Sequence, residues 1–331
     1  MAQIVLGMGT SHGPMLVTPP ETWGVRVPDD KRSPHHYKGR SWTFDELVQV
    51  RQAESLGEQI TLAAWQRKHA ACQRAIASMA EVFAEVRPDI AVLVGNDQME
   101  VYRDALIPAF SVFYGENIIN NPLPPQRMEQ LPQGVRNSMP GYIPASGATY
   151  RGIPDLGRHI IATAMADRFD VAAMQRLPAE ETPHAFGFVY RHLMRDQPVP
   201  SVPVILNTFY PPNQPTVQRC YDFGATLLRA IESWQSDVRV AVIASGGLTH
   251  FVIDEEVDGI LLDAMRTGSI EKVANLGEGI FQDGTSEVKN WLPVAALMAQ
   301  LEFPMHLVDY VPCYRSEAGT GNAMGFVYWK L

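Results

Sequence analysis

The sequence has few cysteines and no extended run of basic or apolar residues. Three cysteines among 331 residues cannot build a disulfide framework, and none stands in a C-x-x-C pair that could hold structural zinc. Acidic residues outnumber basic ones by 36 to 27, and no run of Lys and Arg offers a site for nucleic-acid phosphates. No window approaches the ~20 apolar residues that a membrane-spanning helix needs. The composition therefore predicts an ordinary globular protein that binds neither nucleic acid nor a membrane.

Sequence motifs for nucleotide binding and for serine hydrolysis are also missing. The chain has no G-x-x-x-x-G-K-[ST] loop, no strand leading into G-x-G-x-x-G and no G-x-S-x-G turn. Residues 1–14 lack the basic region and the long apolar stretch of a signal peptide. Together with the odd number of cysteines, this start leads us to expect a cytoplasmic protein.

Short β-rich runs alternate with longer helical patterns. Several runs are almost continuously apolar, which is typical of strands buried on both faces. Strands are predicted over residues 3–9, 89–95, 109–114, 203–207, 238–245, 305–310 and 324–329. Helices are predicted from three-and-four apolar spacing over residues 62–86, 216–234, 254–265 and 285–300. This alternation predicts an α/β fold in which helices cover both faces of a central, mostly parallel or mixed sheet.

The organisation along the chain favours a single domain over residues 1–331. No linker, internal repeat or low-complexity tract divides the sequence. Residues 18–42 and 120–154 are rich in Pro, Gly, Arg and Asn and are predicted to be long irregular loops. Loops of this length within a compact domain usually form lids or binding segments, so we expect them near the functional site.

Polar residues that could carry chemistry follow several of the predicted strands. His12 follows the first strand, Gln98 follows the second, and His250 follows the strand that ends at Ala244. Functional sites in open α/β sheets gather where the carboxyl ends of the strands meet. His184 is a third candidate histidine. Because imidazole serves near neutral pH both as a metal ligand and as an acid or base, these residues indicate a metal centre or a proton-transfer site.

Six short stretches, taken together and in order, resemble one enzyme family. They are residues 11–14 (SHGP), 96–97 (ND), 210–212 (YPP) with 219–220 (RC), 246–250 (GGLTH), 284–292 (GTSEVKNWL) and 320–325 (TGNAMG). In this order they resemble the class III extradiol ring-cleavage dioxygenases, the family of the protocatechuate 4,5-dioxygenase catalytic subunit. The stretches span nearly the whole chain.

The resemblance implies a non-haem Fe(II) enzyme that opens a hydroxylated aromatic ring with O₂. Members of the family hold iron with two histidines and a glutamate, which leaves positions open for substrate and O₂. His12 matches the first histidine ligand and Glu287 matches the carboxylate. His250 matches the acid–base catalyst, and His184 matches a histidine that lines the pocket. The second histidine ligand has no counterpart, because Gln98 stands at its position.

The glutamine at this position leaves three interpretations open. Gln98 could occupy or adjoin the ligand position in a variant metal site, or another histidine could replace it, with His69 and the pair His35 and His36 as candidates. Alternatively, the chain could have lost its metal and act as a scaffold or regulatory subunit of an active relative. A metal-dependent hydrolase that uses the same pocket is a further alternative. Retention of four other polar site residues favours the enzyme.

The resemblance also implies the partners of the protein. These are a small aromatic substrate and O₂, and substrates of the family often carry a carboxylate that a cation would fix. Lys38, Arg40 and Arg151 are candidates for that cation because they lie in the two predicted loops. A homo-oligomer, most simply a dimer, is expected for such a fold.

Overall fold

A mixed sheet of nine strands forms the centre of the molecule. The computed structural model describes residues 1–178 and 180–331. The strands of the sheet are β1 (Gln3–Ser11), β4 (Ile90–Asn96), β5 (Phe110–Phe113), β8 (Ala172–Met174), β9 (Ser201–Leu206), β10 (Arg239–Gly246), β11 (His250–Val252), β12 (Met305–Tyr314) and β13 (Thr320–Trp329). Their order is β11-β13-β1-β10-β4-β9-β5-β8, and β12 pairs with β13 along its other edge.

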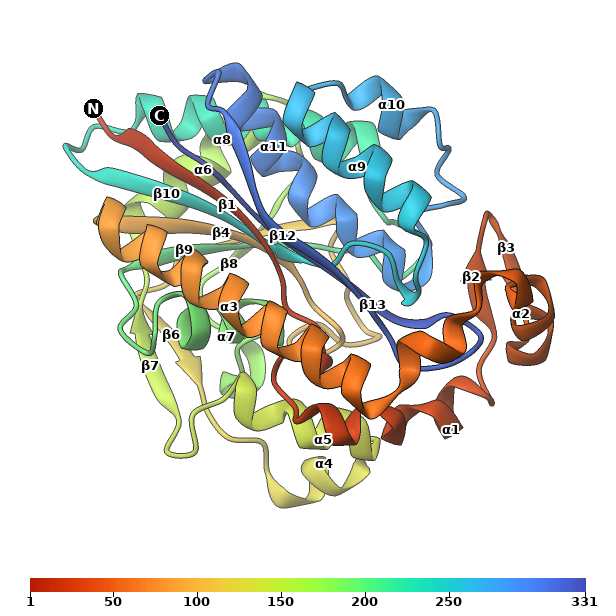
Figure 1. The fold of residues 1–331 in the computed structure, drawn as a ribbon. Helices are drawn as coiled ribbons and strands as arrows, with labels where there is room; N and C mark the ends of the chain where they lie inside the picture. The colour runs from red at the N-terminus through yellow and green to blue at the C-terminus, as the bar shows by residue number, and fades with distance from the viewer.

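Four parallel strands, β1, β10, β4 and β9, run side by side through the middle of this sheet. Val242 of β10 lies between Gly7 of β1 and Val92 of β4 in register. The flanking strands turn the sheet into a mixed one, since β13 is antiparallel to β1 and β5 is antiparallel to β9. The predicted central sheet with helices on both faces is therefore confirmed, and the sheet is mixed (Figure 1).

Helices cover the two faces of the sheet. They are α1 (Val27–Asp30), α2 (Phe44–Val50), α3 (Leu62–Val86), α4 (Pro125–Gln130), α5 (Gln133–Ser138), α6 (Pro154–Ala166), α7 (His184–Phe188), α8 (Val217–Ser233), α9 (Glu255–Thr267), α10 (Ile270–Ala274) and α11 (Trp291–Gln300). Side chains of β4 alternate between the faces, as the strand period of two requires. Val92 and Val94 belong to the core under α6, α8 and α11, whereas Ala91 and Leu93 belong to the core under α3 and α7.

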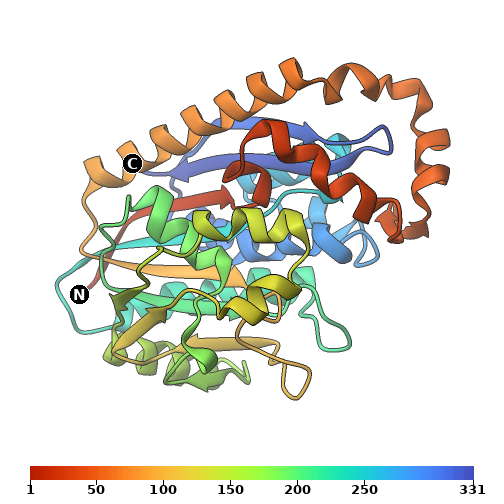
Figure 2. The ribbon, with the colours of Figure 1, turned by 90° about the horizontal axis from the view of Figure 1, so that it is seen from below.

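The longest helix, α3, has the bounds predicted from its apolar spacing. The side chain of Thr61 caps its N-terminus by accepting a hydrogen bond from the backbone N–H of Ala64. Cys72, Ile76 and Met79 form its buried stripe. Figure 2 shows α3 running along the β12–β13 side of the sheet. Across the described residues, no helix combines the length and the apolar character needed to cross a membrane.

The helix predicted over residues 285–300 is divided into two parts. A 3₁₀ helix over Asp283–Asn290 comes first, and α11 continues from Trp291. With three residues per turn, a 3₁₀ helix places residues i and i+3 on the same side. Glu287 and Asn290 are related in this way, and both side chains reach Asn96 at the end of β4. The departure from the predicted helix therefore brings a buried carboxylate to the end of the central strands.

The segments expected to be long irregular loops contain short helices and strands instead. Residues 18–42 include a 3₁₀ helix (Pro20–Arg26), α1 and the hairpin strands β2 (His35–Tyr37) and β3 (Arg40–Trp42). Residues 120–154 include α4, α5 and β7 (Ala148–Arg151), which pairs with β6 (Asn117–Asn120). Pro20 and Pro125 occupy the first positions of their helices, where the missing N–H costs nothing. The second segment reaches the end of β1, since the hydroxyl of Tyr142 donates to the carbonyl of His12 at 2.9 Å.

Candidate active site

Four polar side chains surround the buried carboxylate of Glu287. Its Oε2 lies 3.3 Å from Nε2 of His12 and 3.5 Å from Nε2 of His250. Its Oε1 accepts hydrogen bonds from Nδ2 of Asn96 and Nε2 of Gln98, each at 3.0 Å. The structure thus brings together four residues that the sequence singled out, His12, Gln98, His250 and Glu287.

The order of the sheet explains why these residues meet. His12 directly follows β1, and Asn96 ends β4, while β10 between them ends at Gly246. Because these three strands are parallel, their carboxyl ends lie at one edge of the sheet. After β10 the chain turns at once into β11, which starts with His250.

The hydrogen bonds of His12 define its tautomer. The hydroxyl of Ser245 donates its single proton to the carbonyl of Ala185 at 2.6 Å, so towards His12 it can only accept. Nδ1 of His12 therefore donates to Ser245 Oγ at 2.9 Å, and burial lowers the pKa of the ring. The neutral ring then presents an unprotonated Nε2 to the carboxylate of Glu287.

The ring of His250 is fixed in the same manner from its other side. Its Nδ1 donates to the carbonyl of Leu248 at 2.8 Å, which directs Nε2 towards Glu287. Burial disfavours the protonated ring, but the charge and hydrogen bond of Glu287, the carbonyl of Leu248 and the charge of Asp283 together outweigh burial and raise the pKa of His250. For Glu287, burial disfavours the ionised form, yet His250 and His12 hold its pKa well below the usual value. A proton can therefore reside on His250 beside an ionised carboxylate.

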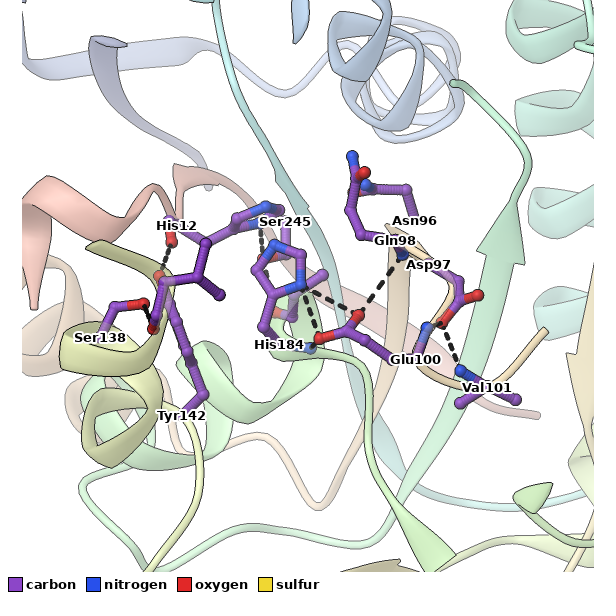
Figure 3. A network of polar contacts seen from close by, with 12 residues as sticks. His12, Asn96, Asp97, Gln98, Glu100, Val101, Ser138, Tyr142, His184 and Ser245 are labelled. Atoms are coloured by element: carbon purple, nitrogen blue, oxygen red, sulfur yellow. Dashed lines mark hydrogen bonds and ion pairs between the residues drawn. The ribbon is translucent and has the colours of Figure 1, made fainter. Parts of the chain in front are cut away.

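His184 lies against His12 and is paired with a glutamate that the sequence did not reveal. Its ring packs edge-to-face on the ring of His12, with centroids 4.6 Å apart, and also contacts Tyr142. Nδ1 of His184 donates to the carboxylate of Glu100 at 2.9 Å, as Figure 3 shows. Burial opposes protonation, but Glu100 outweighs it and raises the pKa of His184 to about 9. His184 therefore faces the site as a charged hydrogen-bond donor.

Asp97 shapes the loop that carries both Gln98 and Glu100. Its carboxylate accepts hydrogen bonds from the backbone N–H groups of Glu100, Val101 and Tyr102 at 2.8–3.1 Å. Figure 3 shows the bond to Val101. These bonds close a tight turn, as Asx side chains commonly do. Burial and the neighbouring Glu100 raise the pKa of Asp97 to about 7.

A cavity of about 390 Å³ opens onto these residues. His12, Gln98, His184, His250 and Glu287 all line it. Its apolar wall is formed largely by the segment 120–154, with Leu123, Leu131, Val135, Met139 and Ile143, and by Met324. A cavity of this size, mostly apolar with a few convergent polar groups, suits a small planar ligand. The segment 120–154, which was expected near the functional site, thus lines this cavity.

The alternative histidines and the predicted cations lie elsewhere. Neither His36 nor His69 is among the described residues that line the cavity. Nε2 of His36 is 2.5 Å from the carbonyl oxygen of Gly279, and the ring of His69 packs against Trp23. Lys38 faces Glu256 at 3.8 Å. Arg40 stacks on Trp42, and Arg151 is an exposed residue of β7. The cations that line the cavity are instead Arg26, Arg103 and Arg127.

The donor chemistry of the site fits iron. Among the described residues, no three His, Cys, Asp or Glu side chains form a complete metal site as they stand. Non-haem Fe(II) centres typically use two imidazoles and a carboxylate, and His12 and Glu287 supply one donor of each kind beside the amide of Gln98. The unprotonated Nε2 of His12 faces a carboxylate oxygen at 3.3 Å, an arrangement of two lone-pair donors that a cation between them would stabilise. The hydrogen bond from Nδ1 to Ser245 is the outer contact that orients metal-ligating histidines.

Comparison with known proteins defines the family. The family model described as the catalytic LigB subunit of aromatic ring-opening dioxygenase matches residues 59–320. The chain therefore belongs to this family of ring-opening dioxygenases. The matched range contains Gln98, His184, His250 and Glu287 and begins after His12.

Two individual proteins are similar to parts of the chain. It is 36% identical over 118 residues to a protein described as gallate dioxygenase from Pseudomonas putida strain KT2440. That match covers 33% of this chain and 34% of the relative, so the chain spans about a third of the length of this curated protein. The crystal structure of the uncharacterized protein JW3007 from Escherichia coli K12 superposes with a TM-score of 0.47 at 13% identity, covering 76% of this chain and 91% of that one.

Proposed function

We propose that the protein is a non-haem Fe(II) extradiol dioxygenase that cleaves the ring of a catecholic or related hydroxylated aromatic acid with O₂. The observation that carries the proposal is the convergence of His12, His250 and Glu287 on one face of the cavity. Membership of the ring-opening dioxygenase family supports the type of reaction. The similarity to a gallate dioxygenase supports an aromatic acid as the substrate.

His12, Glu287 and Gln98 would hold the metal. Bound Fe(II) supplies a Lewis acid for the substrate oxygens and a redox centre for O₂. The amide of Gln98 now donates through Nε2 to Glu287, while its Oε1 faces the hydroxyl of Tyr210 at 3.4 Å. A half-turn of this amide exchanges its oxygen and nitrogen and presents the carbonyl oxygen, which is the donor atom, to the site.

His250 and His184 handle the protons and polar groups of the substrate. With Nδ1 held by Leu248, Nε2 of His250 is the atom that exchanges a proton with the substrate oxygens. His184 is kept protonated by Glu100, so it donates a hydrogen bond to a substrate oxygen. The apolar wall of the segment 120–154 holds the ring and excludes water.

Oxygen uptake after anaerobic loading with Fe(II) tests this function. We expect iron to bind with a stoichiometry of one and uptake to occur on at least one member of a panel of catechols and trihydroxybenzoates. His250→Ala should retain iron and lose ring cleavage, whereas Glu287→Ala should lose both. If the wild-type protein bound no iron and consumed no O₂ on any compound, the chain would be a non-catalytic relative. If it hydrolysed substrates with another divalent metal, it would be a hydrolase of the same pocket.

A further inference from the structure

The cavity wall holds three arginines, and two of them already have polar partners. Arg127 forms an ion pair with Glu181. Arg103 donates to the carbonyl of Glu100 at 3.4 Å. The described residues give the guanidinium of Arg26 neither a hydrogen-bond acceptor nor a carboxylate in ion-pair contact, although the side chain is partly buried in the cavity wall. A cation that has lost part of its hydration and has no partner is stabilised when a ligand supplies one.

The position of Arg26 is set by the packing of its stem. Arg26 ends the 3₁₀ helix Pro20–Arg26 and crosses α5 at Gly134. A Cβ added at Gly134 would lie 2.3 Å from Cγ and 2.8 Å from Cδ of Arg26. Glycine at this position therefore leaves the passage through which the side chain reaches the cavity. The same helix, α5, contributes Val135 and Ser138 to the cavity wall.

The charges around Arg26 leave this region positive. Asp30 is one of two acidic residues that stabilise the charge of Arg26, but it binds Arg315 through two hydrogen bonds of 2.7 Å and accepts a third from Thr320. The other, Asp29, is paired with Arg32. Arg315 is itself buried, and its Nη1 lacks a partner among the described residues. Two guanidinium groups thus share one buried carboxylate, which favours an anion in the cavity. Burial lowers the pKa of Arg26 to about 10, so the side chain remains charged at neutral pH.

We propose that Arg26 binds the carboxylate of the aromatic substrate and thereby selects hydroxylated aromatic acids over neutral catechols. This inference rests on the proposed function, because it assigns a specificity residue to that reaction. The planar guanidinium matches a carboxylate in a two-bond geometry, which a lysine cannot reproduce. The aromatic ring then lies along the apolar wall between Arg26 and the polar residues around Glu287.

Matched substrate pairs test the proposal. We would measure kcat and KM with 3,4-dihydroxybenzoate against catechol and with gallate against pyrogallol, since the members of each pair differ only in the carboxylate. Arg26→Met, which retains an apolar stem, should raise KM for the two acids roughly 10- to 100-fold, as expected for a lost charge-assisted contact. KM for the two neutral compounds should change less than about twofold. KM of Arg26→Lys for the two acids should lie between those of the wild type and Arg26→Met.

Two further variants provide controls. Gly134→Ala leaves the charge in place but obstructs the stem of Arg26, so it should raise KM for the acids selectively. Arg158→Ala removes an exposed arginine of α6 and should change KM for neither substrate class. The proposal would be overturned if Arg26→Met and Arg26→Lys each changed KM equally for the acids and the neutral compounds, or if neither variant changed KM at all. Thermal unfolding of each variant identifies those that fail to fold. If Arg26→Met is one of them, the KM values of Arg26→Lys and Gly134→Ala test the proposal in its place.

A binding measurement separates this proposal from the proposed function. Calorimetry without O₂ gives the dissociation constants of 3,4-dihydroxybenzoate and catechol independently of turnover. If Arg26→Met weakened the binding of 3,4-dihydroxybenzoate but not of catechol, and the wild-type protein showed no oxygen uptake, the result would support the carboxylate site and reject the dioxygenase activity. Active wild-type enzyme in which Arg26→Met binds both compounds like the wild type would reject the carboxylate site alone.

Discussion

His184 donates both its backbone N–H and its ring Nδ1–H to the same oxygen, Oε1 of Glu100, at 2.9 Å each. The two bonds fix the ring relative to its own backbone, so the imidazole cannot turn without breaking one of them. Because Glu100 is only partly exposed, its charge acts on His184 with reduced screening by solvent.

Glu100→Gln should lower the pKa of His184 from about 9, because burial disfavours the imidazolium and Glu100 contributes most of what opposes burial. A raised pKa in the folded state stabilises the protein below the unfolded value of about 6.5, and this stabilisation is lost as the pH rises through about 9. The variant should therefore lose about 3 kcal/mol at pH 6 and little at pH 10. NMR titration of the ring and urea unfolding at both pH values check this. Glu81→Gln, on the surface of α3, is the control, and a pKa of His184 that stays near 9 in Glu100→Gln would contradict the pairing.

Gln98→Ala should weaken Fe(II) binding about 10- to 100-fold if the amide supplies the third protein donor. Gln98→His should strengthen binding, because imidazole is a better ligand for Fe(II) than a carbonyl oxygen. Iron content after dialysis against a chelator measures both. Gln218→Ala on the exposed side of α8 is the matched control. Iron lost from His250→Ala and retained in Gln98→Ala would show that His250 is the ligand instead.

Gly246→Ala should destabilise the protein by roughly 1–3 kcal/mol and lower its iron affinity, because overpacking displaces the neighbouring helix. A Cβ at Gly246 would lie 2.7 Å from the carbonyl oxygen of Glu287 and 3.0 Å from Nε1 of Trp291. Denaturant unfolding and iron binding give the two results. Gly259→Ala on α9 has open space around its Cβ and should be neutral or more stable by up to ~1 kcal/mol. Unchanged iron affinity in Gly246→Ala would mean that the position of the Glu287 helix is not critical.

Asp258→Asn should change how stability depends on pH. Asp258 accepts three hydrogen bonds of 2.7–2.8 Å, from the N–H and hydroxyl of Thr249 and from Tyr310, yet burial raises its pKa to about 7. An acid with a raised pKa loses stability as the pH rises from its unfolded value towards 7, here by about 4 kcal/mol. The stability of Asp258→Asn relative to wild type should therefore increase between pH 4 and pH 8. Urea unfolding across that range tests this, with exposed Asp222→Asn as the control, and parallel pH curves would refute the buried titration.

The parts of the fold that the sequence predicted correctly depend on local patterns. The apolar runs in β4 and β10 and the cap of α3 at Thr61 specify their elements within a few residues. The strands β6, β7, β8 and β11 and the helices α6 and α7 were not predicted. Those elements are short or begin at prolines inside polar stretches, so only contacts with the rest of the molecule distinguish them from loops.

The site was only partly predictable for the same reason. His12 and His250 were found at the ends of predicted strands, where chemistry is concentrated, and Glu287 was assigned only through the resemblance to the dioxygenase family. Glu100 resembles any charged loop residue until His184 packs on it. Arg26 was missed because its role depends on passing Gly134, a contact that no local spacing encodes. The position of a basic residue in a predicted loop did not identify a cation of the cavity, since the side chain of Arg40 is exposed.

The pairing of β1 with β13 has a consequence for how the molecule is made. Gly7 of β1 lies opposite Trp329 of β13, so the strand that leads to His12 gains one of its two neighbours only from residues 326–329. On a ribosome, that edge of β1 stays uncovered until almost the whole described chain has emerged, and an open apolar edge invites wrong partners. Contacts of such long sequence separation also slow folding. We therefore expect newly made protein to depend on chaperones while it folds. Activity should appear only after β13 has paired with β1.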